Sequence, residues 1–129
     1  MRARVVVIGR GDDSVELARS CLSRVGSWMV TAVDSELELM AGAAQPDVIV
    51  IDARVRDSAW TLAIAALRGD RTLGNVPIVV VVPPLLREVE RFLRLPGVAV
   101  VSHAAARFEL ATRVRTALGT IERLLPHAA

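Results

Sequence analysis

The chain contains no lysine and no tyrosine among its 129 residues. All 16 basic residues are therefore arginines, and the 14 acidic residues reduce the formal net charge to +2. The sequence pI of about 9.9 is high because few groups titrate between histidine and arginine, so a small excess of arginine raises it strongly. The composition gives no nucleic-acid signature, since that requires basic residues clustered on one face.

Cysteine and long apolar runs are equally scarce. The single cysteine, Cys21, excludes an internal disulfide and is typical of a reducing compartment. The nearly apolar run 76–86 is interrupted by prolines and is shorter than the roughly 18 residues that a membrane helix needs. Only residues 5–8 are continuously apolar after the charged start, too few for a signal peptide. We therefore expect a soluble, cytoplasmic protein.

Apolar residues are abundant and make up 53% of the chain. This content and length fit one compact domain with one core. We expect residues 1–126 to form that domain and residues 127–129 to be a tail. Five runs rich in valine and isoleucine lack polar alternation, which is typical of strands covered on both faces. These runs span residues 5–8, 29–33, 48–51, 78–82 and 98–101.

Between these runs, apolar residues recur at helical spacing. The expected buried stripes are Val15, Ala18, Leu22 and Val25; Leu37, Met40, Ala41 and Ala44; Trp60, Ala63, Ile64 and Leu67; Leu85, Val89, Phe92 and Leu93; and Ala111, Val114, Leu118, Ile121 and Leu125. The residues expected to cap the first three helices are Ser14 or Asp13, Ser35, and Ser58 or Asp57. The alternation predicts an α/β fold: a (βα)5 doubly wound parallel sheet of five strands in the flavodoxin-like order 2-1-3-4-5.

Asp52 is the residue with the clearest functional meaning, because it ends the run Pro46-Asp47-Val48-Ile49-Val50-Ile51-Asp52. It places a carboxylate at the carboxyl edge of the expected sheet, where such folds bind their ligands. This run resembles the acceptor strand in the receiver domain of two-component response regulators. The resemblance extends over almost the whole chain and also rests on Val30-Thr31-Ala32-Val33-Asp34, Asn75-Val76-Pro77-Ile78-Val79-Val80-Val81 and Glu109-Leu110.

The resemblance implies a non-enzymatic module of phosphorelay signal transduction in which Asp52 occupies the phospho-acceptor position. It also implies a signalling protein as partner, such as a histidine kinase or an output domain. We expect no direct contact with nucleic acid or membrane.

The residues that surround the acceptor in receivers are substituted in this chain. The two acids that hold a divalent cation correspond to Gly9 and Arg10, the hydroxyl residue after the fourth strand to Val82, and the lysine after the fifth strand to His103. Since Mg²⁺ prefers carboxylates and waters in octahedral geometry, we expect poor Mg²⁺ binding and no cofactor. The sequence therefore indicates an atypical, or pseudo-, receiver without standard Mg²⁺-dependent phosphorylation. Phosphorylation of Asp52 by a histidine kinase is the alternative.

Arginines are candidates for the role of the missing cation. Arg10 leaves the strand next to the one that ends at Asp52, so we hypothesise an ion pair that lowers the pKa of Asp52. The alternative is that Arg10 extends into solvent. Arg54 and Arg56 either make the crevice an anion site or are solvated loop residues. His103 is either a donor that titrates near neutral pH or a structurally hydrogen-bonded residue.

Two further patterns have a functional interpretation. Gly9-Arg10-Gly11 fits part of a dinucleotide-binding fingerprint, although Ser14 replaces its third glycine, so a nucleotide- or anion-binding domain is a second alternative. The fourth expected helix carries Arg87, Arg91 and Arg94 on one side, with glutamates between them, a pattern typical of a solvated face. In receivers this helix joins the fifth strand and fifth helix in a dimer or output interface, so the resemblance implies a homodimer or partner surface there.

Overall fold

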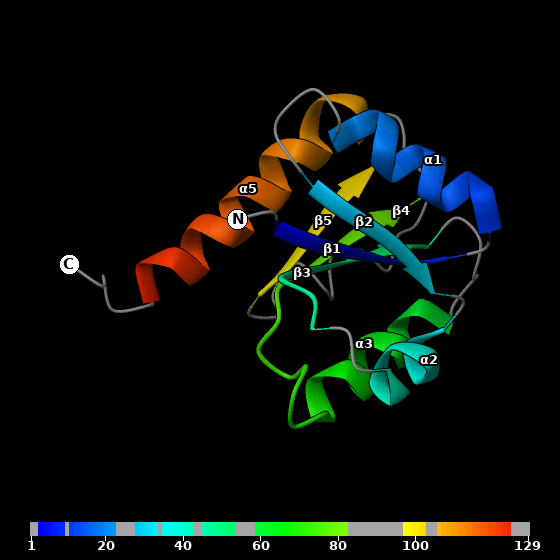
Figure 1. Ribbon diagram of the computed structural model, residues 1–129, viewed down its shortest axis with the longest axis vertical. Coiled ribbons are helices and arrows are strands. Elements are labelled where there is room, and N and C mark those ends of the chain that lie inside the picture. Colours follow the sequence, from blue (N-terminus) through cyan, green and yellow to red (C-terminus); the bar gives the residue numbers. More distant parts are fainter. Residues whose placement is uncertain are drawn as a thin grey trace.

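The computed structural model describes residues 3–9, 11–22, 28–33, 35–42, 45–53, 59–82, 97–102 and 106–124 (Figure 1). Five parallel strands form one sheet in the order β2-β1-β3-β4-β5. They are β1 (Ala3–Ile8), β2 (Trp28–Val33), β3 (Val48–Asp52), β4 (Ile78–Val82) and β5 (Val98–Ser102). The predicted strands and their predicted order are confirmed, with small differences at the strand ends.

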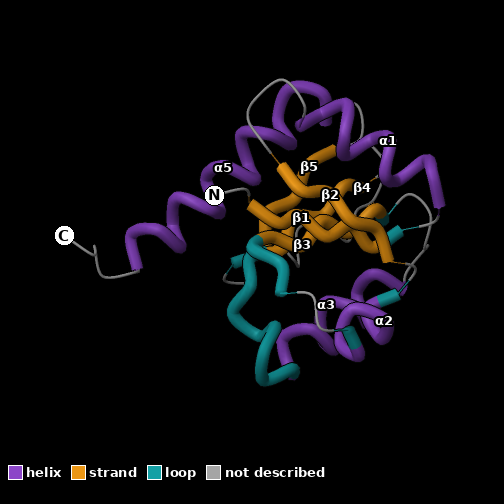
Figure 2. Tube along the Cα trace, viewed as in Figure 1, coloured by secondary structure: helices purple, strands orange, loops and turns teal. Residues whose placement is uncertain are grey.

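Helices cover both faces of the sheet (Figure 2). One face lies under α1 (Gly11–Leu22) and α5 (Ala106–Leu124), and the other under α2 (Glu36–Ala41) and α3 (Ala59–Gly69). Successive strand residues point to opposite faces. Val50 therefore packs in the cluster of α1 and α5, and Ile51 in the cluster of α2 and α3. This two-sided cover explains why β3 and β4 are buried at every residue and contain no polar alternation.

Most of the predicted helical stripes are buried where the structure describes their side chains. The confirmed residues are Ala18 and Leu22 of α1, Trp60, Ala63, Ile64 and Leu67 of α3, and Ala111 and Val114 of α5. The stripe predicted for residues 85–93 lies outside the described residues. No helix within the described ranges is long and apolar enough to cross a membrane.

The stripe predicted for the second helix is wrong. Leu39 is the buried residue of α2, with 2% of its surface exposed, whereas Leu37 is 68% and Met40 36% exposed. The helix has only six residues, fewer than two turns, so apolar spacing alone does not decide which side faces the sheet. Leu39 enters the cluster formed by α2, α3 and the strands, and this contact sets the orientation of the helix.

The predicted helix caps have different outcomes. Ser35 caps α2 as predicted, and its hydroxyl accepts a hydrogen bond of 3.3 Å from the backbone N–H of Glu38. The cap predicted at Ser14 or Asp13 is wrong, because α1 already begins at Gly11 and both residues lie inside it. The predicted cap at Ser58 or Asp57 lies outside the described residues.

Candidate functional site

The candidate site lies at the carboxyl edge of the sheet, where β3 ends in Asp52. Parallel pairing aligns Asp52 with Val81 of β4, and the next backbone N–H, of Ala53, donates to the carbonyl of Val81 at 2.9 Å. The strand therefore holds the Asp52 backbone in place up to its last residue. Asp52 has 0% of its surface exposed, so its carboxylate is withdrawn from bulk water.

Ser14 contacts this carboxylate from α1. Its hydroxyl donates a hydrogen bond of 2.8 Å to Oδ2 of Asp52, and only 1% of the serine surface is exposed. Burying a carboxylate is costly unless donors satisfy it, and hydrogen bonds to a charged acceptor are stronger than neutral ones. The hydroxyl that was predicted to cap the helix therefore stabilises Asp52 instead.

Gly9 makes room for this contact. It follows β1, and its backbone N–H donates to the carbonyl of Val33 at 3.1 Å. A Cβ at this position would lie 2.7 Å from the Cβ of Ser14, closer still to its hydroxyl oxygen, and 3.2 Å from the Cβ of Asp52. Real Cβ atoms essentially never come within 3.0 Å of another heavy atom, so Ser14 would have to shift. Gly9, Ser14 and Asp52 therefore form one packed unit, which we call the glycine–serine–aspartate cluster.

The other predicted site residues are placed as follows. Val82 ends β4, is 3% exposed and packs in the apolar cluster under α2 and α3, so it brings no polar group to this edge. Arg10, Arg54, Arg56 and His103 lie outside the described residues, and so do Arg87, Arg91 and Arg94. The proposed ion pair of Arg10 with Asp52 stays a prediction.

The described residues do not fit a magnesium site at this edge. Within the described ranges there is no group of three or more His, Cys, Asp or Glu side chains that could hold a metal ion. Where a receiver would have its first acid, the cluster has Gly9, and the space beside Gly9 is filled by Ser14. Of the three residues of the cluster, Asp52 is the one that carries a carboxylate. Mg²⁺ needs several oxygen ligands in near-octahedral geometry, and the cluster does not supply them.

The sequence interpretation missed Ser14 as a partner of Asp52, since the two residues are 38 positions apart. One pattern does point to it in retrospect. A glycine stands where receivers have an acid, and a serine follows five positions later, inside the next helix.

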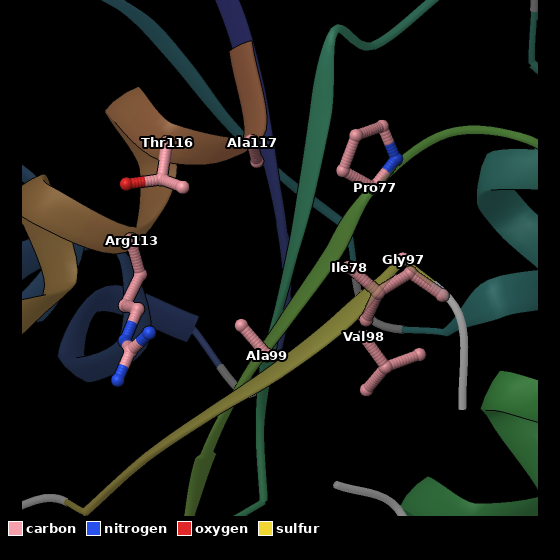
Figure 3. A pocket seen from close by; sticks show the side chains of 8 residues that line it. All are labelled: Pro77, Ile78, Gly97, Val98, Ala99, Arg113, Thr116 and Ala117. Carbon is pink, nitrogen blue, oxygen red and sulfur yellow. The ribbon is translucent and has the colours of Figure 1, made fainter. Parts of the chain in front are cut away.

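A second candidate site is a pocket of about 180 Å³ between the first residues of β4 and β5 and one side of α5 (Figure 3). Its walls are mostly apolar, with Ile78 and Ala99 from the sheet and Ala117 from the helix. Arg113 and Thr116 of α5 bring the polar side chains, and the Thr116 hydroxyl donates to the carbonyl of Thr112 at 2.9 Å. The pocket is lined by β5 and α5, and the resemblance to receivers implies a partner surface on these elements.

Comparison with known proteins gives structural matches only. No protein-family model and no curated protein sequence matches the chain. The signal receiver domain of a signal transduction histidine kinase from Syntrophus aciditrophicus matches with a TM-score of 0.77 at 16% identity, covering 98% of this chain and 97% of that chain.

Two further structures extend this result. The receiver domain of a sensor histidine kinase from Pseudomonas aeruginosa, which has a magnesium ion coordinated in its active-site cleft, matches with a TM-score of 0.73 at 18% identity, covering 92% of this chain and 99% of that chain. A chemotaxis response regulator of Vibrio cholerae matches with a TM-score of 0.63 at 17% identity, covering 97% and 100%. This chain therefore has the fold of a response regulator receiver domain.

Proposed function

We propose that this chain is an atypical receiver domain of two-component signal transduction that acts as a protein-interaction module, without standard Mg²⁺-dependent phosphorylation. The observation that carries the proposal is the buried hydrogen bond of 2.8 Å between the Ser14 hydroxyl and Oδ2 of Asp52, beside a glycine that has no room for a side chain. The likeness of the fold to receiver domains supports the assignment to this signalling class.

The chemistry of aspartyl phosphorylation supports the proposed absence of standard Mg²⁺-dependent phosphorylation. A carboxylate oxygen must attack phosphorus while a cation and positioned donors stabilise the charge on the transferred group. In this chain Asp52 is fully buried, and one of its oxygens accepts from Ser14. The Ser14 hydroxyl, which is packed against Gly9, therefore lies beside the oxygen that a cation would otherwise contact.

Four basic residues have proposed roles that rest on the sequence alone. Arg10 would pair with Asp52 in place of the cation, and Arg54 and Arg56 would make the crevice attractive to anions. His103 would supply a donor where receivers have a lysine. These residues lie outside the described ranges.

The proposed partner is another signalling protein, either a histidine kinase or an output domain. The pocket between β4, β5 and α5 supports this surface as the contact site, because it combines apolar walls with the Arg113 guanidinium. The other proposed contact on this surface is a homodimer through the fourth helix, β5 and α5. The substitution Thr116→Arg places a bulky charge at an exposed position on this surface, so it should weaken binding of either partner.

Intact-mass spectrometry after incubation with acetyl phosphate and Mg²⁺ tests the absence of phosphorylation. We expect no added phosphoryl group, whereas a receiver that retains both acids, treated in parallel, should gain one. A phosphoryl adduct on this chain that disappears in Asp52→Asn would contradict the proposal. That outcome would support the alternative, a working phospho-acceptor at Asp52.

The packing beside Gly9 favours the receiver proposal over the nucleotide-binding alternative. In a dinucleotide fingerprint the glycines let a backbone approach phosphate, but the space beside Gly9 is already filled by Ser14. A ligand that binds only the folded state raises the thermal midpoint. We expect no such rise with a panel of nucleotides.

A further inference from the structure

The pocket between the first residues of β4 and β5 and one side of α5 is bounded by short side chains. Gly97 has no side chain, and Ala99 and Ala117 carry only methyl groups. The Ala99 methyl group points toward α5 (Figure 3), whereas Ile78 and Val98 pack in the apolar cluster on the other face of the sheet. The strand and the helix therefore leave a volume of about 180 Å³ between them.

One charged side chain borders this pocket. All eight lining residues belong to the described ranges, and Arg113 is the one among them that carries a charge. Within those ranges no hydrogen bond or ion pair engages its guanidinium, although Glu109 lies one turn before it on α5. A guanidinium offers N–H donors and no acceptor. The pocket therefore favours a ligand that combines an apolar body with a negatively charged acceptor.

We propose that this pocket binds a small organic carboxylate whose apolar body has about the size of one benzene ring. An apolar cavity of about 150 Å³ holds benzene, so a volume of about 180 Å³ accommodates one such ring. The ring lies against the methyl groups of Ala99 and Ala117. The carboxylate accepts from the guanidinium of Arg113, whose planar fork of donors matches its two oxygens.

This pocket is separate from the site at Asp52. Its strand residues lie at the start of β4 and β5, at the amino edge of the sheet, whereas Asp52 ends β3 at the carboxyl edge. Binding of a carboxylate is therefore independent of phosphorylation at Asp52. The proposal goes beyond the proposed function, because a bound carboxylate occupies the surface on which a signalling protein is proposed to dock, so the two ligands compete.

Titration of the full chain with sodium benzoate, followed by ¹H–¹⁵N correlation NMR, tests the proposal. We expect saturable shifts of the Ala99, Arg113 and Ala117 amide signals, and weaker binding of benzamide, which has the same ring without the negative charge. Arg113→Gln should raise the dissociation constant of benzoate about fivefold, the effect expected for an ion pair at an exposed position. The matched control is Arg115→Gln on the same helix, outside the pocket lining, which should leave the dissociation constant unchanged.

Ala117→Leu tests the pocket itself, because the larger side chain fills the space beside Ala99 and should abolish the shifts. Leucine is a good helix former, so α5 is kept, which circular dichroism checks. Thr112→Leu, at an exposed position of α5 outside the pocket lining, is its matched control and should bind benzoate as before. The proposal is overturned if benzoate causes no saturable shift, if benzamide binds equally well, or if binding persists in Ala117→Leu.

Discussion

At the scale of single residues, Gly9, Ser14 and Asp52 depend on one another. Asp52 is buried at the end of β3 and needs donors, and the Ser14 hydroxyl supplies one at 2.8 Å. Ser14 reaches this position only because Gly9 has no Cβ. The absence of a side chain at position 9 thus leaves room for a hydroxyl from α1. Changing any one of the three residues should therefore affect the other two.

Gly9→Ala should lower the free energy of unfolding by about 1–3 kcal/mol, the usual cost of overpacking a core. Combining it with Ser14→Gly removes the two atoms nearest to the new methyl group, so the two changes should not add. Urea denaturation measures all the variants. The matched control is Gly69→Ala, where a built Cβ has no atom within 4 Å and stability should stay the same or rise slightly. Equal effects of the two alanine substitutions would contradict this packing.

At the scale of elements, Arg68 ties the end of α3 to the loop before β4 and to the start of β5. Its Nη1 donates to the carbonyls of Gly74 at 2.9 Å and Val76 at 2.8 Å, and its Nη2 donates to the carbonyl of Gly97 at 3.1 Å. Burial lowers the pKa of Arg68, but a guanidinium stays charged in proteins. Gly97 has a φ of 73°, a conformation that favours glycine. The planar fork of donors fits three carbonyls that a single ammonium would not reach together.

Arg68→Lys should therefore lower the free energy of unfolding by about 1–3 kcal/mol, since carbonyls lose their donors while the charge is kept. The matched control is Arg19→Lys on the exposed side of α1, which should change stability by no more than about 0.5 kcal/mol. Both variants are compared by urea denaturation at one protein concentration. If the two lysine variants are equally stable, the fork of Arg68 contributes nothing beyond its charge.

At the scale of the whole molecule, the sequence predicts the architecture better than the site. Continuous apolar runs such as β3 identify buried strands, and their alternation with helices predicts a parallel sheet and its order. The contact of Ser14 with Asp52 joins residues 38 positions apart, so it depends on how α1 leaves the sheet. The orientation of α2, with Leu39 inward and Leu37 outward, likewise depends on packing against the sheet. Both features come from tertiary contacts that local patterns do not contain.

Thermal unfolding with and without an excess of Mg²⁺ tests the central claim most directly, namely that the glycine–serine–aspartate cluster replaces the cation site. A cation that binds the folded state must raise the thermal midpoint. The structure predicts the same midpoint with and without Mg²⁺, both for this chain and for Asp52→Asn. A rise of the midpoint with Mg²⁺ that is lost in Asp52→Asn would contradict it.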